Sequence, residues 1–450
     1  MATFLPGLWR GLLWIEPIWI VALAPSLLFR DLLWDPWLHP WLILGLFLFW
    51  PLRLLATRRI APPSPLVWPA LLLLLWAPVG LLNSVDWERS WHAIGFVALG
   101  SALLFALLNW PPLSRHPWLV AAILGITGIG LALLGPAILP NLPQEFLLFS
   151  EDLTRSEPAD FFNAGETINP NVLAGGLLLP IPVLAALAFY NWAKRRWFPP
   201  LLLVPTLLIL ATLILAQSRG AYLAVVISLL LVLTLRWPWA GLIVLISGVA
   251  VGSVLSLDGA LLFAEAIGSD GSITSLSGRW EVWDRSLQAF GDFMLTGIGI
   301  GTFDLVVPVL YPYVELRAVT SHAHNLLLQV GVDLGLPGLL LYLWLLGSAC
   351  WIFSHVLRSG GQLDILEASE PRTSHARRSQ RHQLRRQATL RCALAAGGLA
   401  ALVAMLVHGL VDAIMWGTKL SFIAWLLFAL AGALYRQEHQ NNETTFDLQS

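Results

Sequence analysis

Long apolar runs separated by short polar stretches are the most regular feature of the chain. A helix needs about 20 mostly apolar residues to cross a bilayer, and about twelve runs approach that length. The pattern therefore predicts an all-α integral membrane protein with about 12 transmembrane helices. The predicted spans are 11–29, 37–52, 66–82, 91–109, 118–138, 171–193, 199–216, 220–235, 239–257, 324–354, 392–411 and 419–435.

The polar connections between these runs alternate in charge. Every second connection is basic, and by the positive-inside rule these connections face the cytoplasm. Both termini then lie in the cytoplasm, and the other connections face the outer side. The basic connections contain Arg53, Arg58 and Arg59, then Arg115, then Lys194, Arg195 and Arg196, then Arg236, and finally the arginine-rich segment 355–391.

This topology divides the chain into four parts. Residues 1–257 hold the first nine spans, and residues 258–323 form a large loop on the outer side. Residues 324–435 hold the last three spans with the basic cytoplasmic loop 355–391, and residues 436–450 form a cytoplasmic tail.

The first apolar run also has the features of a cleavable signal peptide. Arg10 precedes it, and Ala22 and Ala24 flank a leucine as in a small-residue cleavage motif. Pro25 would directly follow the cut, where proline is poorly tolerated. We therefore expect the run to be kept as the first membrane helix.

Composition agrees with a membrane location. Of 450 residues, 57% are hydrophobic and 12% are charged, and the mean hydropathy is +0.73. A soluble fold of this size needs a far more polar surface. The formal net charge of -1 excludes the overall basic field that gathers nucleic acid. Cys350 and Cys392 are too few for a disulfide framework or a cysteine-based zinc site.

The large outer loop has a helical pattern of its own. Trp280, Trp283, Leu287 and Phe290 recur at three- and four-residue steps, which predicts an amphipathic helix lying at the membrane interface. Glycine at every second position of 297–301 predicts a flexible turn. An ordered outer loop of this size is expected to act as the lid of a site.

Four polar clusters interrupt the apolar background, and the predicted topology places all of them on the outer side. Within the second cluster, Arg219 follows such a short connection that it lies at or just below the surface, where an unpaired cation is costly. It either reaches lipid phosphate or binds an anionic group of a substrate, and its planar guanidinium suits a diphosphate. The clusters are Asn169-Pro170-Asn171, Ser218-Arg219-Gly220, Gly278-Arg279 and Ser321-His322-Ala323-His324-Asn325.

The histidines permit several interpretations. His322 and His324 point apart if they lie on a helix, and no matching carboxylate cluster is visible, so a metal site is disfavoured. A neutral histidine acting as a general base fits better, because nearby arginines lower its pKa. The structural alternative is a histidine bonded to lipid or backbone. His408 and Asp412, one helical turn apart, are interpreted as a polar clamp between helices, with a functional role as the alternative.

The ordered set of clusters resembles the O-antigen ligase family, which also includes polysaccharide polymerases. The similarity extends from about residue 165 to about residue 345. The residues that carry it are Asn169-Pro170-Asn171 with Leu173-Ala174-Gly175; Ser218-Arg219-Gly220-Ala221; Gly278-Arg279 with Trp283; Gly297, Gly299, Gly301 and Phe303; and His322-Ala323-His324-Asn325 with Leu328, Gly331, Gly335, Leu336 and Gly338.

The resemblance implies a GT-C-like, metal-independent inverting glycosyltransferase without a cofactor. Such enzymes lie in the bacterial inner membrane and act on its periplasmic or outer face. They pass a glycan from an undecaprenyl diphosphate carrier to an acceptor hydroxyl, such as that of a lipid A-core glycolipid in lipopolysaccharide biosynthesis. The family's functional arginines and histidine match the positions of Arg219, Arg279 and His324. We expect substrate-binding residues at Asn169, Asn171, Ser218, His322 and Asn325.

Three alternatives stay open. A polymerase of the same family uses the same chemistry on another acceptor. Some relatives have been described as inorganic-carbon transporters, but carriers usually place ionisable groups near the bilayer midplane, whereas the polar groups here gather at one face. A scaffold subunit of an envelope-assembly complex would need none of these side chains for catalysis.

Overall fold

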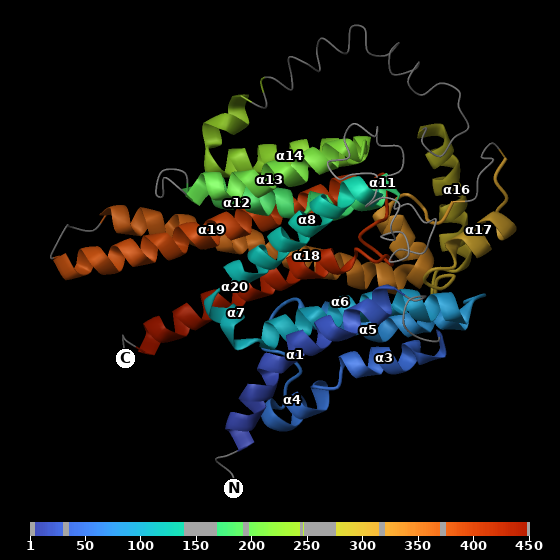
Figure 1. Cartoon of the computed structure of the whole chain (residues 1–450), viewed down its shortest axis with the longest axis horizontal. Coiled ribbons are helices and arrows are strands. Elements are labelled where there is room, and N and C mark those ends of the chain that lie inside the picture. Colours follow the sequence, from blue (N-terminus) through green and yellow to red (C-terminus); the bar gives the residue numbers. More distant parts are fainter. Residues whose placement is uncertain are drawn as a thin grey trace.

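The computed structural model of the chain describes residues 5–29, 36–138, 169–191, 198–243, 246, 276–314, 320–369 and 375–447. Every regular element in these ranges is helical, and most of the long helices run along one common direction (Figure 1). The helices are α1 (Leu5–Leu28), η1 (Pro36–Leu38), α3 (His39–Leu46), α4 (Trp50–Thr57), α5 (Val67–Trp76), η2 (Ala77–Leu82), α6 (Trp87–Asn109), α7 (Pro111–Arg115), α8 (Trp118–Ile138), α11 (Pro170–Leu178), α12 (Pro180–Asn191), α13 (Phe198–Leu215), α14 (Arg219–Arg236), α16 (Leu276–Asp292), α17 (Phe303–Leu310), α18 (Leu326–Ser369), α19 (His375–Gly409) and α20 (Phe422–Asp447).

Six segments of the described helices are long and apolar enough to cross a membrane, which confirms the prediction of a helical membrane protein. Four shorter apolar helices cover further predicted spans. The total of about twelve spans and their topology stay predictions, and most of the predicted span 239–257 lies outside the described residues. The six segments are Trp87–Asn109, Trp118–Gly135, Pro170–Asn191, Arg219–Arg236, Leu326–Gly360 and Arg385–Gly409.

Proline divides several of the predicted spans. The span predicted at 37–52 is two helices, α3 and α4, and Pro51 stands in the first turn of α4. Likewise α5 passes into the 3-10 helix η2 just before Pro78, and α12 begins at Pro180. Proline has no N–H to donate and its ring crowds the preceding turn, so a continuous helix is interrupted at these points.

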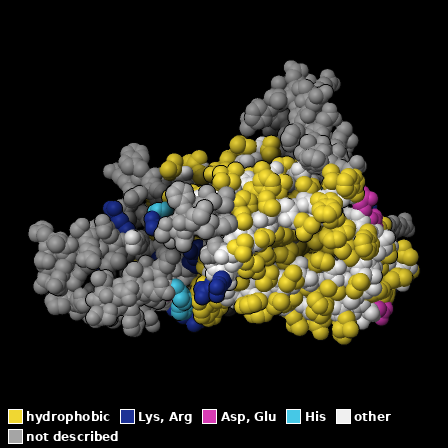
Figure 2. All heavy atoms as spheres, turned by 90° about the horizontal axis from the view of Figure 1, so that it is seen from below, with side chains coloured by type: hydrophobic (Ala, Val, Ile, Leu, Met, Phe, Trp, Pro, Cys, Tyr) yellow, Lys and Arg dark blue, Asp and Glu magenta, His cyan; other side chains and the backbone are white. Residues whose placement is uncertain are grey.

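The helices differ in whether they face the interior or the surroundings. Within the membrane-length segments, 83% of the α6 segment and 89% of the α11–α12 segment is buried, against 28% of α14. The first two are therefore central and α14 is peripheral. Figure 2 shows apolar side chains covering the body of one face, with Lys and Arg toward one end and Asp and Glu at the other. An apolar belt between charged ends is the surface expected against lipid.

The sequence placed Arg53 in a basic connection between helices, but in the structure it lies within a helix. It lies in α4 with its side chain 2% exposed, and its guanidinium forms an ion pair with Glu16 of α1. It also donates a hydrogen bond of 3.0 Å to the Ile60 carbonyl. A buried charge is tolerated only with such partners, so Arg53 joins α1 to α4 through a buried ion pair.

The helix predicted in the outer loop is present as α16. Of the four apolar residues that predicted it, Trp280 and Leu287 are exposed, whereas Trp283 and Phe290 are half-buried. The side that packs against α18 carries Val282, Ser286 and Ala289, which are fully buried. Small side chains at these positions let α16 lie close to its neighbour.

The glycine segment 297–301 is closely packed where the pattern predicted a flexible turn. Gly297, Gly299 and Gly301 all have positive φ angles. A Cβ on Gly297 would lie 2.3 Å from the Asp333 carbonyl oxygen of α18, so only glycine permits this approach. A pair between Arg89 of α6 and Asp304 of α17, at 2.9 Å, also holds this region to the bundle.

Candidate active site at one end of the bundle

The polar clusters gather at the end of the bundle where α11, α16 and α17 are labelled in Figure 1. The N-terminal ends of α11, α14 and α18 lie there, and so does the loop 410–421 that follows α19. The C-terminus lies at the opposite end. A pocket of about 610 Å³ between α4, α5 and α20, which includes Arg58 and Arg59, is therefore remote from the polar site.

The histidine segment is held in an unusual backbone conformation. His324 has a φ of 48°, in the left-handed region that most side chains avoid. Asn325 begins α18 by accepting a hydrogen bond from the Leu328 N–H at 3.0 Å, and its amide group donates to the Leu410 carbonyl at 3.2 Å. The Trp283 indole donates to the His324 carbonyl at 3.3 Å. Strain of this kind persists where the surroundings hold it, and it is common at functional sites.

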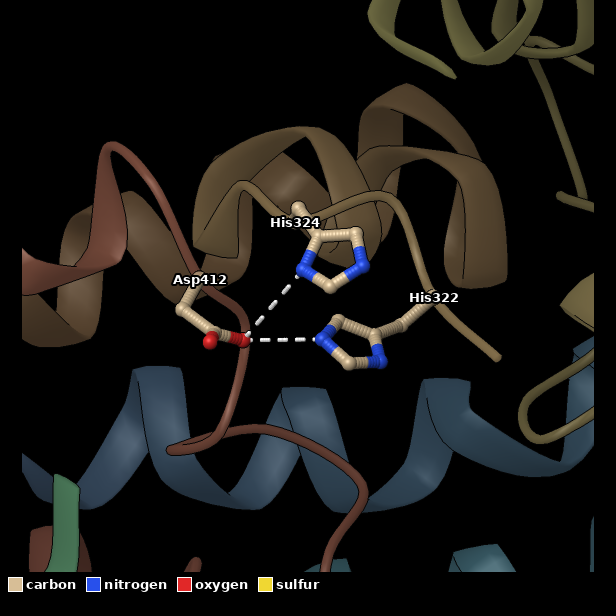
Figure 3. Close-up of side chains that lie close together, drawn as sticks. All are labelled: His322, His324 and Asp412. Atoms are coloured by element: carbon tan, nitrogen blue, oxygen red, sulfur yellow. Dashed lines mark hydrogen bonds and ion pairs between the residues drawn. The ribbon is translucent and has the colours of Figure 1, made fainter. Parts of the chain in front are cut away.

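Asp412 supplies the carboxylate that sequence patterns did not reveal. It follows α19 and is 3% exposed, and one of its oxygens accepts a hydrogen bond from His322 Nε2 at 2.8 Å (Figure 3). The same oxygen lies 3.9 Å from His324 Nδ1. The sequence favoured a polar clamp between helices for His408 and Asp412; in the structure Asp412 lies after the end of α19 and contacts the histidine segment. The contact joins residues 90 positions apart, so periodicity gave no signal for it.

The ring nitrogens of the two histidines are engaged differently. His322 uses both: Nε2 bonds Asp412, and Nδ1 lies 2.8 Å from Ser321 Oγ. His324 Nδ1 is buried without a hydrogen-bond partner, facing Asp412, and the other nitrogen points away from the carboxylate (Figure 3). The ring centroids are 4.2 Å apart. With Nδ1 carrying its hydrogen toward Asp412, the lone pair of the other ring nitrogen is left to take a proton, and Asp412 is placed to orient the ring.

Electrostatics keep His324 neutral and Asp412 ionised. Burial lowers the pKa of His324 to about 4; the neighbouring His322 and Arg279 add to this, and Asp412 opposes it. Burial alone would raise the pKa of the Asp412 carboxyl, but its hydrogen bond to His322 and the three nearby histidines bring it to about 2. A neutral imidazole beside a carboxylate is the arrangement of a general base.

Two arginines lie close to this pair. Arg219 is the first residue of α14, and a Cβ on the next residue, Gly220, would lie 2.6 Å from the Val411 side chain. That close packing brings the start of α14 against the segment that carries Asp412. Burial lowers the pKa of Arg279, with Asp412 opposing and Arg219 adding to the effect, so these charges lie within range of one another.

Neither guanidinium is neutralised by an ion pair with any residue that the structure describes. The buried Nε of Arg279 has no hydrogen-bond partner. Ser218 precedes Arg219 as the buried cap residue of α14, yet its side chain makes no capping bond. Two unpaired guanidinium groups beside the free N–H groups of a helix start form a setting suited to an anion.

The two asparagines of the first cluster lie at the same end of the bundle. Asn169 caps α11, and its side chain accepts a hydrogen bond from the Asn171 N–H at 2.9 Å. α11 is placed beside the Asp412 loop, because a Cβ on Gly175 would lie 3.1 Å from Ile414. Asn169 thus has a structural role, and substrate binding by either asparagine stays a prediction.

His322, His324 and Asp412 are also close enough to be considered as metal ligands, since one ligand atom of each lies within 4.8 Å of the others. However, the Asp412 oxygen already accepts hydrogen bonds of 2.8 Å from His322 and from the Ala413 N–H. These contacts have hydrogen-bond lengths and use the lone pairs that a metal would need. The arrangement fits a hydrogen-bonded base better than a metal centre.

Fold and site together define a helical membrane protein with a histidine–aspartate pair and two free arginines at one end of its bundle. A protein-family model described as O-Antigen ligase matches residues 204–343, from α13 to the middle of α18. This part of the chain is therefore similar to the O-antigen ligase family, a family of glycosyl-transferring ligases and polymerases. The match includes Arg219, Arg279, His322 and His324. No curated protein matches the chain.

Proposed function

We propose that this protein is a metal-independent inverting glycosyltransferase that moves a glycan from an undecaprenyl diphosphate carrier to an acceptor hydroxyl. The observation that carries the proposal is the imidazole of His324: its Nδ1 lies 3.9 Å from Asp412, its other ring nitrogen points away from the carboxylate, and Arg279 lies within electrostatic range. The charge asymmetry of the chain supports a site on the periplasmic or outer face of the inner membrane, with both termini in the cytoplasm.

In the proposed reaction the acceptor oxygen attacks the anomeric carbon from the face opposite the diphosphate. His324 takes the proton of the acceptor hydroxyl, and Asp412 stabilises the imidazolium that forms. The bond between the anomeric carbon and the diphosphate oxygen breaks with its electron pair on the diphosphate. Arg219 and Arg279 stabilise that developing charge. Attack and departure on opposite faces invert the configuration of the sugar.

The most direct test follows the two substrates. The purified protein, reconstituted in vesicles, should transfer a labelled glycan from an undecaprenyl diphosphate donor to a glycolipid acceptor. Labelled inorganic carbon supplied to the same vesicles should not be taken up. Uptake without transfer would instead support the transporter hypothesis.

Deletion of the gene separates the ligase from the polymerase. Long glycans left on their carrier are the expected result for a ligase, whereas single repeat units on the carrier indicate a polymerase. Ligation to a lipid A-core acceptor is the form of the reaction that we propose.

Transfer should survive removal of divalent metal ions. Two guanidinium groups offer the positive charge that a metal ion supplies in other transferases, so a chelator is expected to leave the rate unchanged. The measurement is initial rate with and without the chelator, followed by addition of Mg²⁺ or Zn²⁺. Loss of activity that an added ion restores would show that the His322, His324 and Asp412 atoms hold a metal instead.

The pH profile should report the low pKa of His324. A general base acts in its neutral form, so activity persists above its pKa and is lost as the pH falls through that value. With the pKa at about 4, kcat/KM is expected to stay level from pH 8 down to about pH 5, below the ordinary histidine value of about 6.5. A fall centred near pH 6.5 would contradict a buried base.

A further inference from the structure

A buried carboxylate inside α18 connects the two segments that carry the candidate base and its partner. Asp333 is 1% exposed. One of its oxygens accepts a hydrogen bond from the Gln329 amide at 2.9 Å, and the other accepts from the Trp416 indole at 2.9 Å. Each oxygen therefore has a donor, and the two donors belong to different parts of the chain.

Gln329 extends this connection to the histidine segment. Its side-chain oxygen accepts a hydrogen bond from the Ala323 N–H at 2.6 Å, in the residue between His322 and His324. The orientation of the amide is thereby fixed, because its NH₂ must face Asp333 and its oxygen must face the peptide. Through this bond Asp333 helps to hold the left-handed backbone of His324.

Trp416 extends the connection to the other partner. It lies in the same loop as Asp412, four residues later, and is 4% exposed. Its ring packs edge-on against Tyr342 of α18 with centroids 5.3 Å apart. The hydrogen bond to Asp333 therefore anchors the loop that presents Asp412 to the histidines.

The backbone around Asp333 is fixed as well. α18 departs from helical geometry at Gly335, which has φ 70° and ψ -174°. The Ile298 N–H donates to the Val332 carbonyl at 2.9 Å, and the Leu336 N–H donates to the Met294 carbonyl at 2.7 Å. The segment 294–298 thus bonds α18 on both sides of the break at Gly335. These bonds fix the backbone that carries Asp333.

We propose that Asp333 is a positioning residue for the transfer site. Its carboxylate sets the separation of His324 and Asp412 by binding Gln329 on one side and Trp416 on the other. This inference rests on the proposed function, because it needs His324 to act as the base. A carboxylate is required, since an amide at this position offers one acceptor to two donors.

The first test is Asp333→Asn. The asparagine leaves either the Trp416 N–H or the Gln329 amide without an acceptor, and so loosens one side of the site. We expect kcat to fall about 10- to 100-fold, because misplacement of a catalytic group by about 1 Å has effects of this size. The KM for the lipid-linked donor should change little, because Asp333 is buried and does not contact the donor directly.

The second test restores every hydrogen bond by exchanging the two side chains. In a variant with Asp333→Asn and Gln329→Glu, the glutamate accepts from the Ala323 N–H and from the new amide, and the asparagine oxygen accepts from Trp416. Charge and donor count equal those of the native pair. We expect this double variant to recover most of the kcat lost in Asp333→Asn.

The matched control is Asp304→Asn, which removes a carboxylate from the exposed pair with Arg89 and should leave kcat near the native value. Native kcat in Asp333→Asn, or a double variant no more active than the single one, would overturn the proposal. If Asp333→Asn does not fold, the folded double variant still decides, since it should be active. His324→Ala, assayed in parallel, isolates the other failure: full activity there would disprove the proposed function.

Discussion

His324→Ala is expected to reduce transfer by about 1,000-fold, within the range of 10²–10⁴ that a general base contributes. The loss should be in kcat, with the KM for the donor nearly unchanged, because the arginines that bind the diphosphate remain. His324 is buried, so the comparison needs equal membrane insertion and an equal unfolding midpoint in both proteins. Single-turnover transfer from the lipid-linked donor is the measurement.

The control for this variant is His116→Ala, which changes an exposed histidine just after α7 and should leave the rate intact. His322→Ala is more informative. Its removal frees the Asp412 oxygen for His324 Nδ1 but deprives the carboxylate of one of its two hydrogen bonds of 2.8 Å, so we expect a smaller loss than for His324→Ala. A larger loss of activity in His322→Ala than in His324→Ala would indicate that His322 is the general base.

Alanine in place of Arg279 or Arg219 is expected to reduce transfer about 100- to 1,000-fold, the usual effect of removing one group that stabilises charge in the transition state. Lysine should restore only part of the rate, because it keeps the charge but loses the planar pair of donors. The effects of the two arginines should be less than additive in the double variant, since both act on one leaving group.

Arg285→Ala is the matched control for Arg279, because it changes an arginine of the same helix that pairs with Asp284 at 3.3 Å. It should stay near native activity. Equal losses in Arg285→Ala and Arg279→Ala would mean that α16 is merely destabilised. Native rates in both Arg219→Ala and Arg279→Ala would remove the proposed role in stabilising the leaving group.

Much of the helical framework was predictable because a long apolar run acts locally. The ends of α6, α8, α13 and α14 lie close to the predicted limits. The polar clusters lay at the ends of such runs, and the structure places them at one end of the bundle. Their catalytic and binding roles stay predictions.

The contacts within the candidate site depend on which helices pack together. The helical repeat of apolar positions along the sequence does not reveal those contacts. Asp412 pairs with a histidine 90 positions away, and the sequence pattern did not single out Asp333 within its apolar span. The same limit applies to α16: the apolar pattern predicted an amphipathic helix, and only the structure shows that Val282, Ser286 and Ala289 are the side chains buried beside α18. Only the assembled bundle distinguishes such choices.

The residues matched by the family model and the residues of the candidate site cover different parts of this chain. The matched residues 204–343 end inside α18, while Asp412 and Trp416 follow α19. The matched residues therefore include the arginines and histidines of the candidate site but not Asp412. Under the proposed mechanism, a shortened protein limited to residues 204–343 would keep the sequence signature and lack the carboxylate that orients His324, so tests of the reaction need the chain at least as far as the loop after α19.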